Sequence, residues 1–142
     1  MISRKDLLSI LAVVDIAIHA RDRPLSAQAV AASQGLHSRF FEHVLNHLAH
    51  CGILTSYRGK YVGGYRLARA SKLISLADIV HALSEMRDGA HIDIQSPIGE
   101  RVVIPALAQA ERKLFDALKR ISIQDLVRHA KSLKVTQSSD AS

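Results

Sequence analysis

The stretch that decides the fold is SAQAVAASQGLHSRFFEHVLNHLAHCG, which runs from Ser26 to Gly52. Ser26 fits the N-cap of a short helix over AQAVAASQ, and Gly35 fits the left-handed residue that ends many helices. A longer helix follows after Leu36 and runs to His50, where Gly52 closes it. A short helix, a glycine turn and a longer helix together predict a helix-turn-helix arrangement.

The longer helix has one apolar face. Its apolar residues recur at helical spacing and predict the buried side: Phe41, Val44, Leu45 and Leu48. The other faces carry Arg39, Glu42, His43 and Asn46. A helix of about 14 residues is roughly 21 Å long, and its first turn can enter a major groove about 12 Å wide. There Ser38 could donate to phosphate, Arg39 could bond guanine or phosphate and Glu42 could accept from cytosine, unless this face is only solvated.

The next stretch, RGKYVGGYRLARA from Arg58 to Ala70, holds three arginines, one lysine, three glycines and two tyrosines. The β-prone residues Ile53 to Tyr57 precede it, and Tyr65 to Leu67 form a second such run, which predicts a hairpin with its tip in residues 59–64. A phosphate-binding loop would need a serine or threonine after the lysine, and the glycine spacing is not that of a dinucleotide site. A glycine-tipped hairpin with an arginine at its shoulder has the form of a wing.

This wing carries the basic residues that we expect to meet a nucleic acid. Narrow minor grooves concentrate negative potential and attract inserted arginine, so Arg58 is predicted to enter the minor groove. Lys60, Arg66 and Arg69 are predicted to add phosphate contacts, which bring strong salt dependence.

Capping boxes mark further helices on both sides of these motifs. Ser3 and Asp6 open a helix that is apolar on most sides, which predicts a central position in the fold, and this helix ends before Pro24. Ser75 and Asp78 open the helix LADIVHALSEM, and a loop is predicted after it up to residue 96.

The last long helix is predicted within residues 97–121, with either a regular start or a kink at Pro105. Its apolar residues recur at spacings of three and four and form a narrow seam: Val103, Leu107, Ala110, Leu114, Ala117, Leu118 and Ile121. Such a seam packs against another helix, and we favour a contact with a second copy over packing within the chain. Ser122 with Asp125 caps a final helix to about Leu133, and the tail KVTQSSDAS is predicted to be disordered.

These elements predict a mainly α fold with a small β-hairpin. We expect a winged helix-turn-helix DNA-binding domain in residues 1–70, dimerisation and sensor helices in 71–133 and a disordered tail in 134–142. The chain of 142 residues has a net charge of +6, of which residues 1–69 hold +5 and residues 70–142 hold +1. The basic excess predicts a polyanion-binding surface in the first half, although a basic surface can also serve solubility alone.

Composition excludes several classes of protein. Hydrophobic residues make up 48% and charged residues 23%, as in a folded soluble protein, and no apolar run reaches the roughly 18 residues of a membrane span. No signal-peptide pattern opens the chain, so we expect a cytoplasmic protein without a membrane partner. No nucleophile, base and orienting group stand at a recognised spacing, which argues against an enzyme.

Cys51 is the only cysteine, which excludes an internal disulfide and an all-cysteine metal or iron–sulfur site within one chain. It is a candidate redox sensor, because a protonated His47 or His50 would favour its thiolate although the helix dipole disfavours it. The alternative is a small residue packed at a helix end. His43 and His47 have the spacing of a helical metal pair, but HVLNH lacks the glutamate of the zinc-protease motif. Four histidines, at 37, 43, 47 and 50, could still bind a metal ion, but we favour exposed or DNA-facing histidines and expect no metal site.

Three stretches carry a resemblance to a known family: RGKYVGGYRLARASKLISLADIVHAL, with DIAIHARDRPLSAQAVAASQGL before it and KRISIQDLV after it. They resemble the Rrf-two (Rrf2) family of bacterial winged-helix transcriptional regulators of the IscR, NsrR and CymR type. The resemblance covers Met1 to about Leu133. It implies a dimer, usually a repressor, that docks a recognition helix in each of two major grooves of a palindromic operator and places a wing arginine in the minor groove.

The resemblance also implies roles for individual residues. By position, the recognition-helix contacts would come from Ser38, Arg39, Phe40, Glu42 and His43, and the wing contact from Arg58. His37 stands where the family commonly has serine, so the cap of this helix departs from the family pattern.

The largest departure concerns cofactors. Cluster-binding members carry three cysteines in the segment that reads RDGAHIDIQSPIGERVVIPAL here, and this segment contains none. Ser96 stands where several relatives, including cluster-free ones similar to YwnA, have a cysteine. We therefore expect no iron–sulfur cluster and no cofactor. His91, Asp93 and Glu100 could bind another ligand, although a solvated loop is the favoured interpretation.

The sequence is thus interpreted as that of a DNA-binding transcriptional regulator, with a double-stranded DNA operator and a second copy of the chain as partners. An unidentified effector or protein partner stays open. The alternative is a winged-helix module that binds protein and no longer binds DNA.

Overall fold

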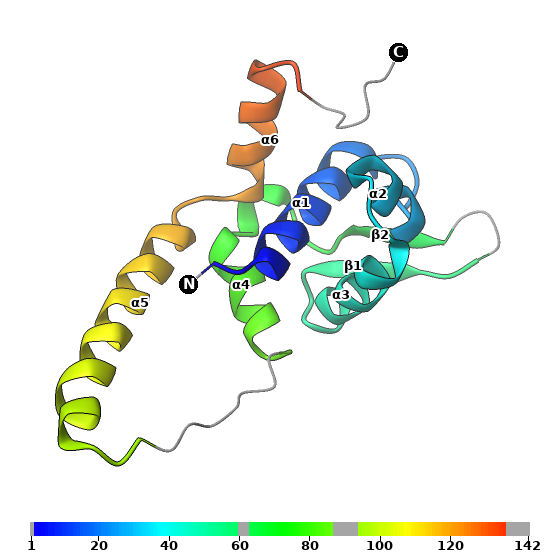
Figure 1. The fold of residues 1–142 in the computed structure, drawn as a ribbon. Helices are drawn as coiled ribbons and strands as arrows, with labels where there is room; N and C mark the ends of the chain where they lie inside the picture. Colours follow the sequence, from blue (N-terminus) through cyan, green and yellow to red (C-terminus); the bar gives the residue numbers. More distant parts are fainter. Residues whose placement is uncertain (1, 60–62, 87–93, 136–142) are drawn as a thin grey trace.

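The computed structural model describes residues 2–59, 63–86 and 94–135. The described elements follow in the order α1 (Arg4–His19), α2 (Ala27–Gln34), α3 (Ser38–His50), β1 (Leu54–Tyr57), β2 (Gly64–Leu67), η1 (Ser71–Leu73), α4 (Leu76–Ser84), η2 (Gly99–Val103), α5 (Ile104–Lys119) and α6 (Ile123–Ser132). Figure 1 shows a body of helices with the hairpin and α5 extending from opposite sides. The predicted mainly α fold with one small hairpin is confirmed.

Helix α1 lies at the centre of this body, as its apolar surface predicts. It begins with the expected capping box, in which the Asp6 amide donates to the Ser3 hydroxyl at 3.2 Å and the Ser3 amide donates to the Asp6 carboxylate at 2.8 Å. It contacts α2, α3, α4, α6 and β2. One carboxylate is buried with it: Asp15 accepts hydrogen bonds from Gln34, at 2.9 Å, and from Ser33. Because a buried carboxylate is costly without donors, these bonds fix the end of α2 against α1.

The helix-turn-helix forms as predicted. Gly35 ends α2 with φ of 66°, in the left-handed region, and the Leu36 amide returns to the Ala31 carbonyl at 3.0 Å. The predicted core face of α3 is fully buried: Phe41, Val44, Leu45 and Leu48 are each 0% exposed. Helix α3 is therefore held by its apolar face, and its opposite face is left to solvent or to a ligand.

A third segment of the chain pairs with the two-stranded hairpin, which the sequence did not indicate. Strands β1 and β2 pair antiparallel from Leu54 with Leu67 to Tyr57 with Gly64. Leu25, in the segment that enters α2, adds an isolated bridge to Tyr65. The tip-side end of the paired strands is thereby fastened to the start of the helix-turn-helix.

The C-terminal helices return to the same core. Ser75 and Ser122 cap α4 and α6 with complete capping boxes, and the two residues also form an isolated bridge. The Leu76 amide donates to the Ile121 carbonyl at 2.9 Å, which brings α6 back against α1. Buried residues from both predicted domains belong to one core cluster, so the boundary near residue 70 stays a prediction about function rather than packing.

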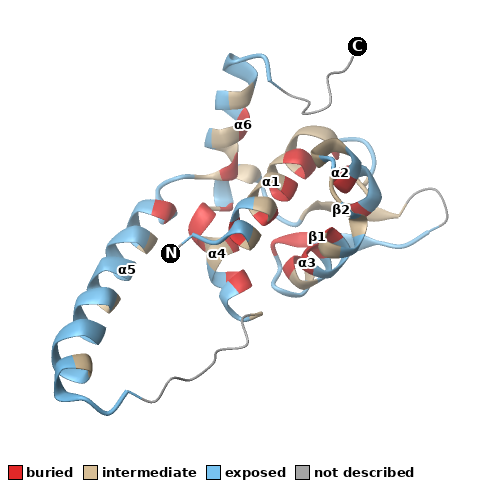
Figure 2. Ribbon diagram, viewed as in Figure 1, coloured by how far each residue is buried: buried red, intermediate tan, exposed pale blue. Residues whose placement is uncertain are grey.

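Helix α5 is the exposed element (Figure 2). A π-helical turn, η2, runs into it, and Pro105 lies in its first turn, where a missing amide costs nothing. The α-helical part begins at Ile104, beside Pro105, but the π-helical turn runs directly into it, so neither a regular start nor a kink at Pro105 is selected. Of the residues of α5, Leu118 alone is buried.

Three predicted segments fall largely outside the described residues. The wing tip at 60–62 and most of the predicted loop and tail cannot be compared with the structure, although Lys134 and Val135 are exposed. Among the described helices, none has the length and apolar character needed to span a membrane.

Candidate nucleic-acid interface

The exposed face of α3 carries most of the predicted base-reading residues. Arg39, Glu42 and His43 are exposed, and Ser38 is half-buried as the first residue of the helix. His37 occupies the N-cap without a side-chain hydrogen bond to the helix. The first amides of α3 are therefore not capped by this side chain, and such amides are donors suited to an anion.

Phe40 differs from its neighbours. Its ring meets that of Phe41 edge to face, with centroids 5.2 Å apart, and it packs on the core as a half-buried residue. The predicted contact of Phe40 with a nucleic acid is untested, and its ring already contributes to packing below the exposed face.

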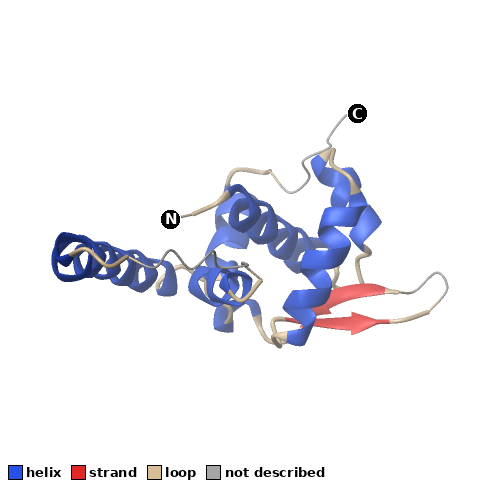
Figure 3. Ribbon diagram, turned by 60° about the horizontal axis from the view of Figure 1, so that its bottom comes forward, coloured by secondary structure: helices blue, strands red, loops and turns tan. Residues whose placement is uncertain are grey.

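A groove of about 620 Å³ lies between the start of α2, the middle of α3 and one side of the hairpin. Within it Gln28 donates to the Glu42 carboxylate at 3.1 Å. Burial and the nearby Glu42 carboxylate both raise the pKa of Tyr65, with burial the larger cause. Arg23 also lines this groove. The sequence motifs did not point to Arg23, although it and Arg21 both precede α2. Figure 3 shows the hairpin reaching past the helices beside this region.

Arg58 lies on the other side of the hairpin. It is exposed just after β1 and lines a second hollow of about 570 Å³ together with Asn46 and His50 of α3. With the residues that the structure describes, Arg58 forms no hydrogen bond or ion pair, so its guanidinium is available to an external acceptor. Lys60, the second predicted wing contact, lies outside the described residues.

Arg66 is engaged within the chain. Its Nε donates to the Ala20 carbonyl at 3.3 Å, and its Nη2 donates to the Arg21 carbonyl. Arg69, another predicted phosphate contact, faces Asp78 at 3.7 Å with both side chains 42% exposed. This side chain therefore links the hairpin to the end of α1 with two of its five N–H donors, and its predicted phosphate contact stays untested.

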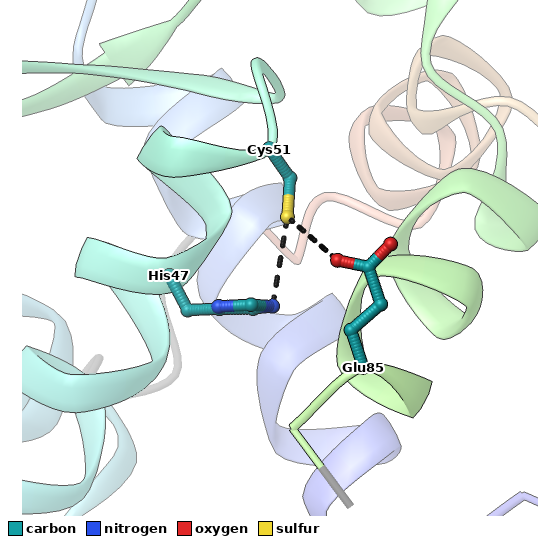
Figure 4. A group of neighbouring side chains, drawn as sticks. All are labelled: His47, Cys51 and Glu85. Atoms are coloured by element: carbon teal, nitrogen blue, oxygen red, sulfur yellow. Dashed lines mark hydrogen bonds between the residues drawn. The ribbon is translucent and has the colours of Figure 1, made fainter.

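A cluster of three polar side chains lies at the other end of α3 (Figure 4). The Cys51 Sγ atom is 3.5 Å from His47 Nε2 and 3.8 Å from Glu85 Oε2. His47 Nε2 also contacts the Ala82 carbonyl of α4 at 2.8 Å. His47 therefore faces α4 rather than the exposed face of α3, which departs from the expectation of an exposed or DNA-facing histidine.

The surroundings of Cys51 favour its protonated thiol. Burial raises the pKa of Cys51, and the Glu85 carboxylate raises it further through its charge and by accepting a hydrogen bond from the thiol. The sequence suggested the histidines as neighbours of this thiol but missed Glu85. In the sequence Glu85 comes 34 residues after Cys51, with the hairpin between them. A protonated thiol reacts slowly, so this environment does not favour the candidate redox role.

The comparisons with known proteins point in one direction. Residues 2–129 match Rrf2, described as an iron-dependent transcriptional regulator. The chain is 30% identical to the protein rrf2 of Nitratidesulfovibrio vulgaris over 122 residues, covering 83% of this chain and 81% of that protein. It is 25% identical to the transcriptional regulator IscR of Xenorhabdus nematophila over 143 residues, covering 99% of this chain and 87% of that protein.

Solved structures agree with the fold. The IscR of T. potens superposes with a TM-score of 0.74 and 26% identity, covering 94% of this chain and 90% of that one. The cysteine regulator CymR of B. subtilis gives a TM-score of 0.66 at 21% identity, covering 91% and 97%, a likeness that speaks for the fold alone.

Rrf2 is described as iron-dependent, and the cluster-binding members that this sequence resembles hold an iron–sulfur cluster. Such clusters are held by four cysteine thiolates, or by two cysteines and two histidines. This chain offers Cys51 alone. Its residues therefore do not fit a cluster of either kind within one chain.

Proposed function

Because its residues 2–129 match the Rrf2 family, the chain belongs to that family of transcriptional regulators, and we propose that it acts as a dimeric repressor of a palindromic operator. The family and its named members are DNA-binding regulators rather than enzymes, as the sequence predicts. The observation that supports the finer proposal is the exposed face of α3 beside a hairpin whose Arg58 has no partner among the described residues.

In this proposal α3 enters the major groove. Arg39 is an exposed guanidinium in the first turn, where it can bond guanine or phosphate. Ser38, Glu42 and His43 stand on the same half of the helix and contribute the remaining base and phosphate contacts, with Phe40 supporting them from below. Glu42 would exchange its bond from Gln28 for a donor on a base edge.

Arg58 and the wing would follow the adjacent minor groove. The hollow beside Arg58 opens toward the C-terminal half of α3, so a backbone that follows α3 passes the base of the wing. Lys60 follows two residues later and is proposed as a phosphate contact. Arg66 is proposed as a further phosphate contact through the donors that its bonds to the Ala20 and Arg21 carbonyls leave unused.

The second copy would pack on α5. Four large apolar side chains of the seam remain exposed: Val103 by 46%, Leu107 by 60%, Leu114 by 37% and Ile121 by 37%. Leu107 and Leu114 share one face of α5 at about 3.6 residues per turn, while Val103 ends η2 just before the helix and Ile121 follows its C-cap. Phe115, on a different face, contacts His81 of α4, with ring centroids 6.2 Å apart. Leu118, also of the seam, is buried in the chain's own core, so the chain covers the C-terminal part of the seam and a second copy would cover the rest around Leu107.

A dimer of this kind has a consequence for the DNA. A twofold axis would present two α3 helices, and the half-sites of such regulators are spaced by about 34–36 Å, one helical turn of DNA. Selection of bound sequences from a random DNA pool should therefore enrich an inverted repeat. Enrichment of a single unrepeated site would contradict the dimeric reading. Absence of any enrichment would favour the alternative, a winged-helix module that binds protein.

A further inference from the structure

The cluster of His47, Cys51 and Glu85 joins the C-terminal ends of α3 and α4. His47 lies in the last turn of α3, and Cys51 is its C-cap. Glu85 is the C-cap of α4. The three atoms Nε2, Sγ and Oε2 offer one thiol, one imidazole and one carboxylate, and the ligand atoms of these residues all lie within 4.8 Å of one another.

We propose that His47, Cys51 and Glu85 bind one divalent cation of the zinc class between α3 and α4. Thiolate, imidazole and carboxylate are the three ligand types that proteins use for Zn²⁺. A tetrahedral ion with bonds of about 2.3 Å to sulfur and about 2.0–2.2 Å to nitrogen or oxygen holds these ligand atoms roughly 3.5 Å apart. The Sγ atom of Cys51 is 3.5 Å from Nε2 and 3.8 Å from Oε2, so two edges of the tetrahedron are nearly formed.

Binding exchanges existing hydrogen bonds for metal bonds. The Cys51 thiol, which donates to Glu85, releases its proton to solvent as the sulfur bonds the ion. The His47 ring turns Nε2 from the Ala82 carbonyl, 2.8 Å away, to the ion and carries its own proton on Nδ1. The metal-free contact and the metal site are therefore two alternative uses of the same histidine nitrogen.

The fourth position faces a hollow of about 310 Å³ that Cys51 and Glu85 line. His50 and His81 stand on its wall, while Asp78 is already paired with Arg69. Water fills the fourth position in sites that keep one coordination place open.

This site is distinct from an iron–sulfur centre, which the residues of this chain do not fit. It uses the single cysteine together with side chains of other types, at the junction of α3 and α4. If α3 reads DNA, an ion that ties its last turn to α4 changes how α3 is held. This consequence rests on the proposed function, whereas ion binding does not.

The first experiment measures the ion alone. Protein stripped with a chelator is titrated with Zn²⁺ against a chromophoric competitor, and with Co²⁺ by visible spectroscopy. We expect one ion per chain and a thiolate-to-cobalt charge-transfer band in the near ultraviolet. Cys51→Ser should abolish this band, and His47→Gln and Glu85→Gln should each weaken binding by at least about tenfold, the loss that even an outer-shell partner can cause.

Two matched variants serve as controls. His129→Gln on α6 and Glu111→Gln on α5 remove the same side-chain types at exposed positions outside the hollow and should leave the affinity unchanged. Circular dichroism establishes that each variant is folded, and His47→Gln keeps a donor for the Ala82 carbonyl. The site is refuted if the wild type binds no ion in this competition, if the cobalt complex lacks the thiolate band, or if the controls lose as much affinity as the three variants.

The second experiment keeps the two proposals apart. Affinity for the selected operator is compared with Zn²⁺ and with a chelator, and we expect a change of at least about fivefold, the lower end of usual coupling, that Cys51→Ser removes. If an ion binds without altering operator affinity, the proposed coupling is overturned but the proposed metal site stands. Loss of operator binding altogether would overturn the proposed function, and the cobalt spectrum would still decide the site.

Discussion

Leu25 and Tyr65 exchange two backbone hydrogen bonds, of 3.0 Å from the Leu25 amide and 2.9 Å from the Tyr65 amide. This pairing joins the wing to the chain that enters α2, so the two parts of the proposed DNA-binding surface move as one. Gly64 makes the approach possible. A Cβ at Gly64 would lie 2.6 Å from the Leu25 carbonyl carbon, closer than two such atoms can be packed.

Gly64→Ala should therefore destabilise the fold more than a glycine substitution that creates only backbone strain. Gly52 is the matched control, because its φ of 80° is also unfavourable for alanine while nothing lies within 4 Å of the added carbon. We expect a loss of about 1–3 kcal/mol for Gly52→Ala from strain, and more than about 3 kcal/mol for Gly64→Ala, where the Leu25 backbone must also move. Urea unfolding followed by circular dichroism measures both. Equal losses would show that the contact with Leu25 is not confining.

Arg58→Ala should weaken operator binding without changing stability, because the side chain is exposed and forms no hydrogen bond or ion pair with the described residues. The largest loss is expected at operators with A·T-rich, narrow minor grooves, and the salt slope of log K should fall by about 1. Arg101→Ala removes an exposed arginine of η2, away from the wing, and is the control. Fluorescence anisotropy over a salt series gives both quantities. If Arg58→Ala retains wild-type affinity and slope, the wing assignment is wrong.

The elements that sequence predicts well are those specified by local signals. Capping boxes at Ser3, Ser75 and Ser122 each begin a helix where the pattern indicated, because the cap bonds reach only three residues along the chain. The buried face of α3 follows from helical spacing in the same way. Such features need no knowledge of what lies across the fold.

The parts of the candidate site that sequence missed depend on residues distant in the chain. Arg66 reads as a basic wing residue, and only the folded chain brings the Ala20 carbonyl to it. Glu85 reads as an exposed helix residue, and only the packing of α4 on α3 brings it to Cys51. Charge and spacing identify residues able to bind DNA or metal, but tertiary contacts decide which of them are already occupied.

The exposed stripe on α5 predicts a dimer that one charge can break. Leu107 is 60% exposed in the single chain, so Leu107→Glu should be tolerated by the monomer fold but should disfavour burial against a second copy. Leu73→Glu is the matched control, since Leu73 is 59% exposed on η1 outside the seam. Light scattering coupled to size exclusion should give a monomer for the first variant and a dimer for the second. A dimer in both would exclude the centre of the seam as the interface.

The thiol of Cys51 offers a test of the geometry around Glu85 in metal-free protein. Because burial and Glu85 raise its pKa, the reactive thiolate forms only as the pH rises above the ordinary range of a cysteine. Alkylation by iodoacetamide in the presence of a chelator should therefore be slow at neutral pH and should accelerate with a midpoint shifted upward. Glu85→Gln removes the charge, so its midpoint should lie lower than that of the wild type.

Glu100→Gln changes an exposed residue outside the hollow that Cys51 and Glu85 line, so it should leave the alkylation profile unchanged. A downward shift confined to Glu85→Gln would place the carboxylate beside the thiol in solution. A wild-type midpoint at the ordinary value would contradict the raised pKa, and a midpoint below it would make Cys51 an activated thiol instead. The redox role would then regain support, because a low-pKa, exposed thiolate is the form that oxidants attack.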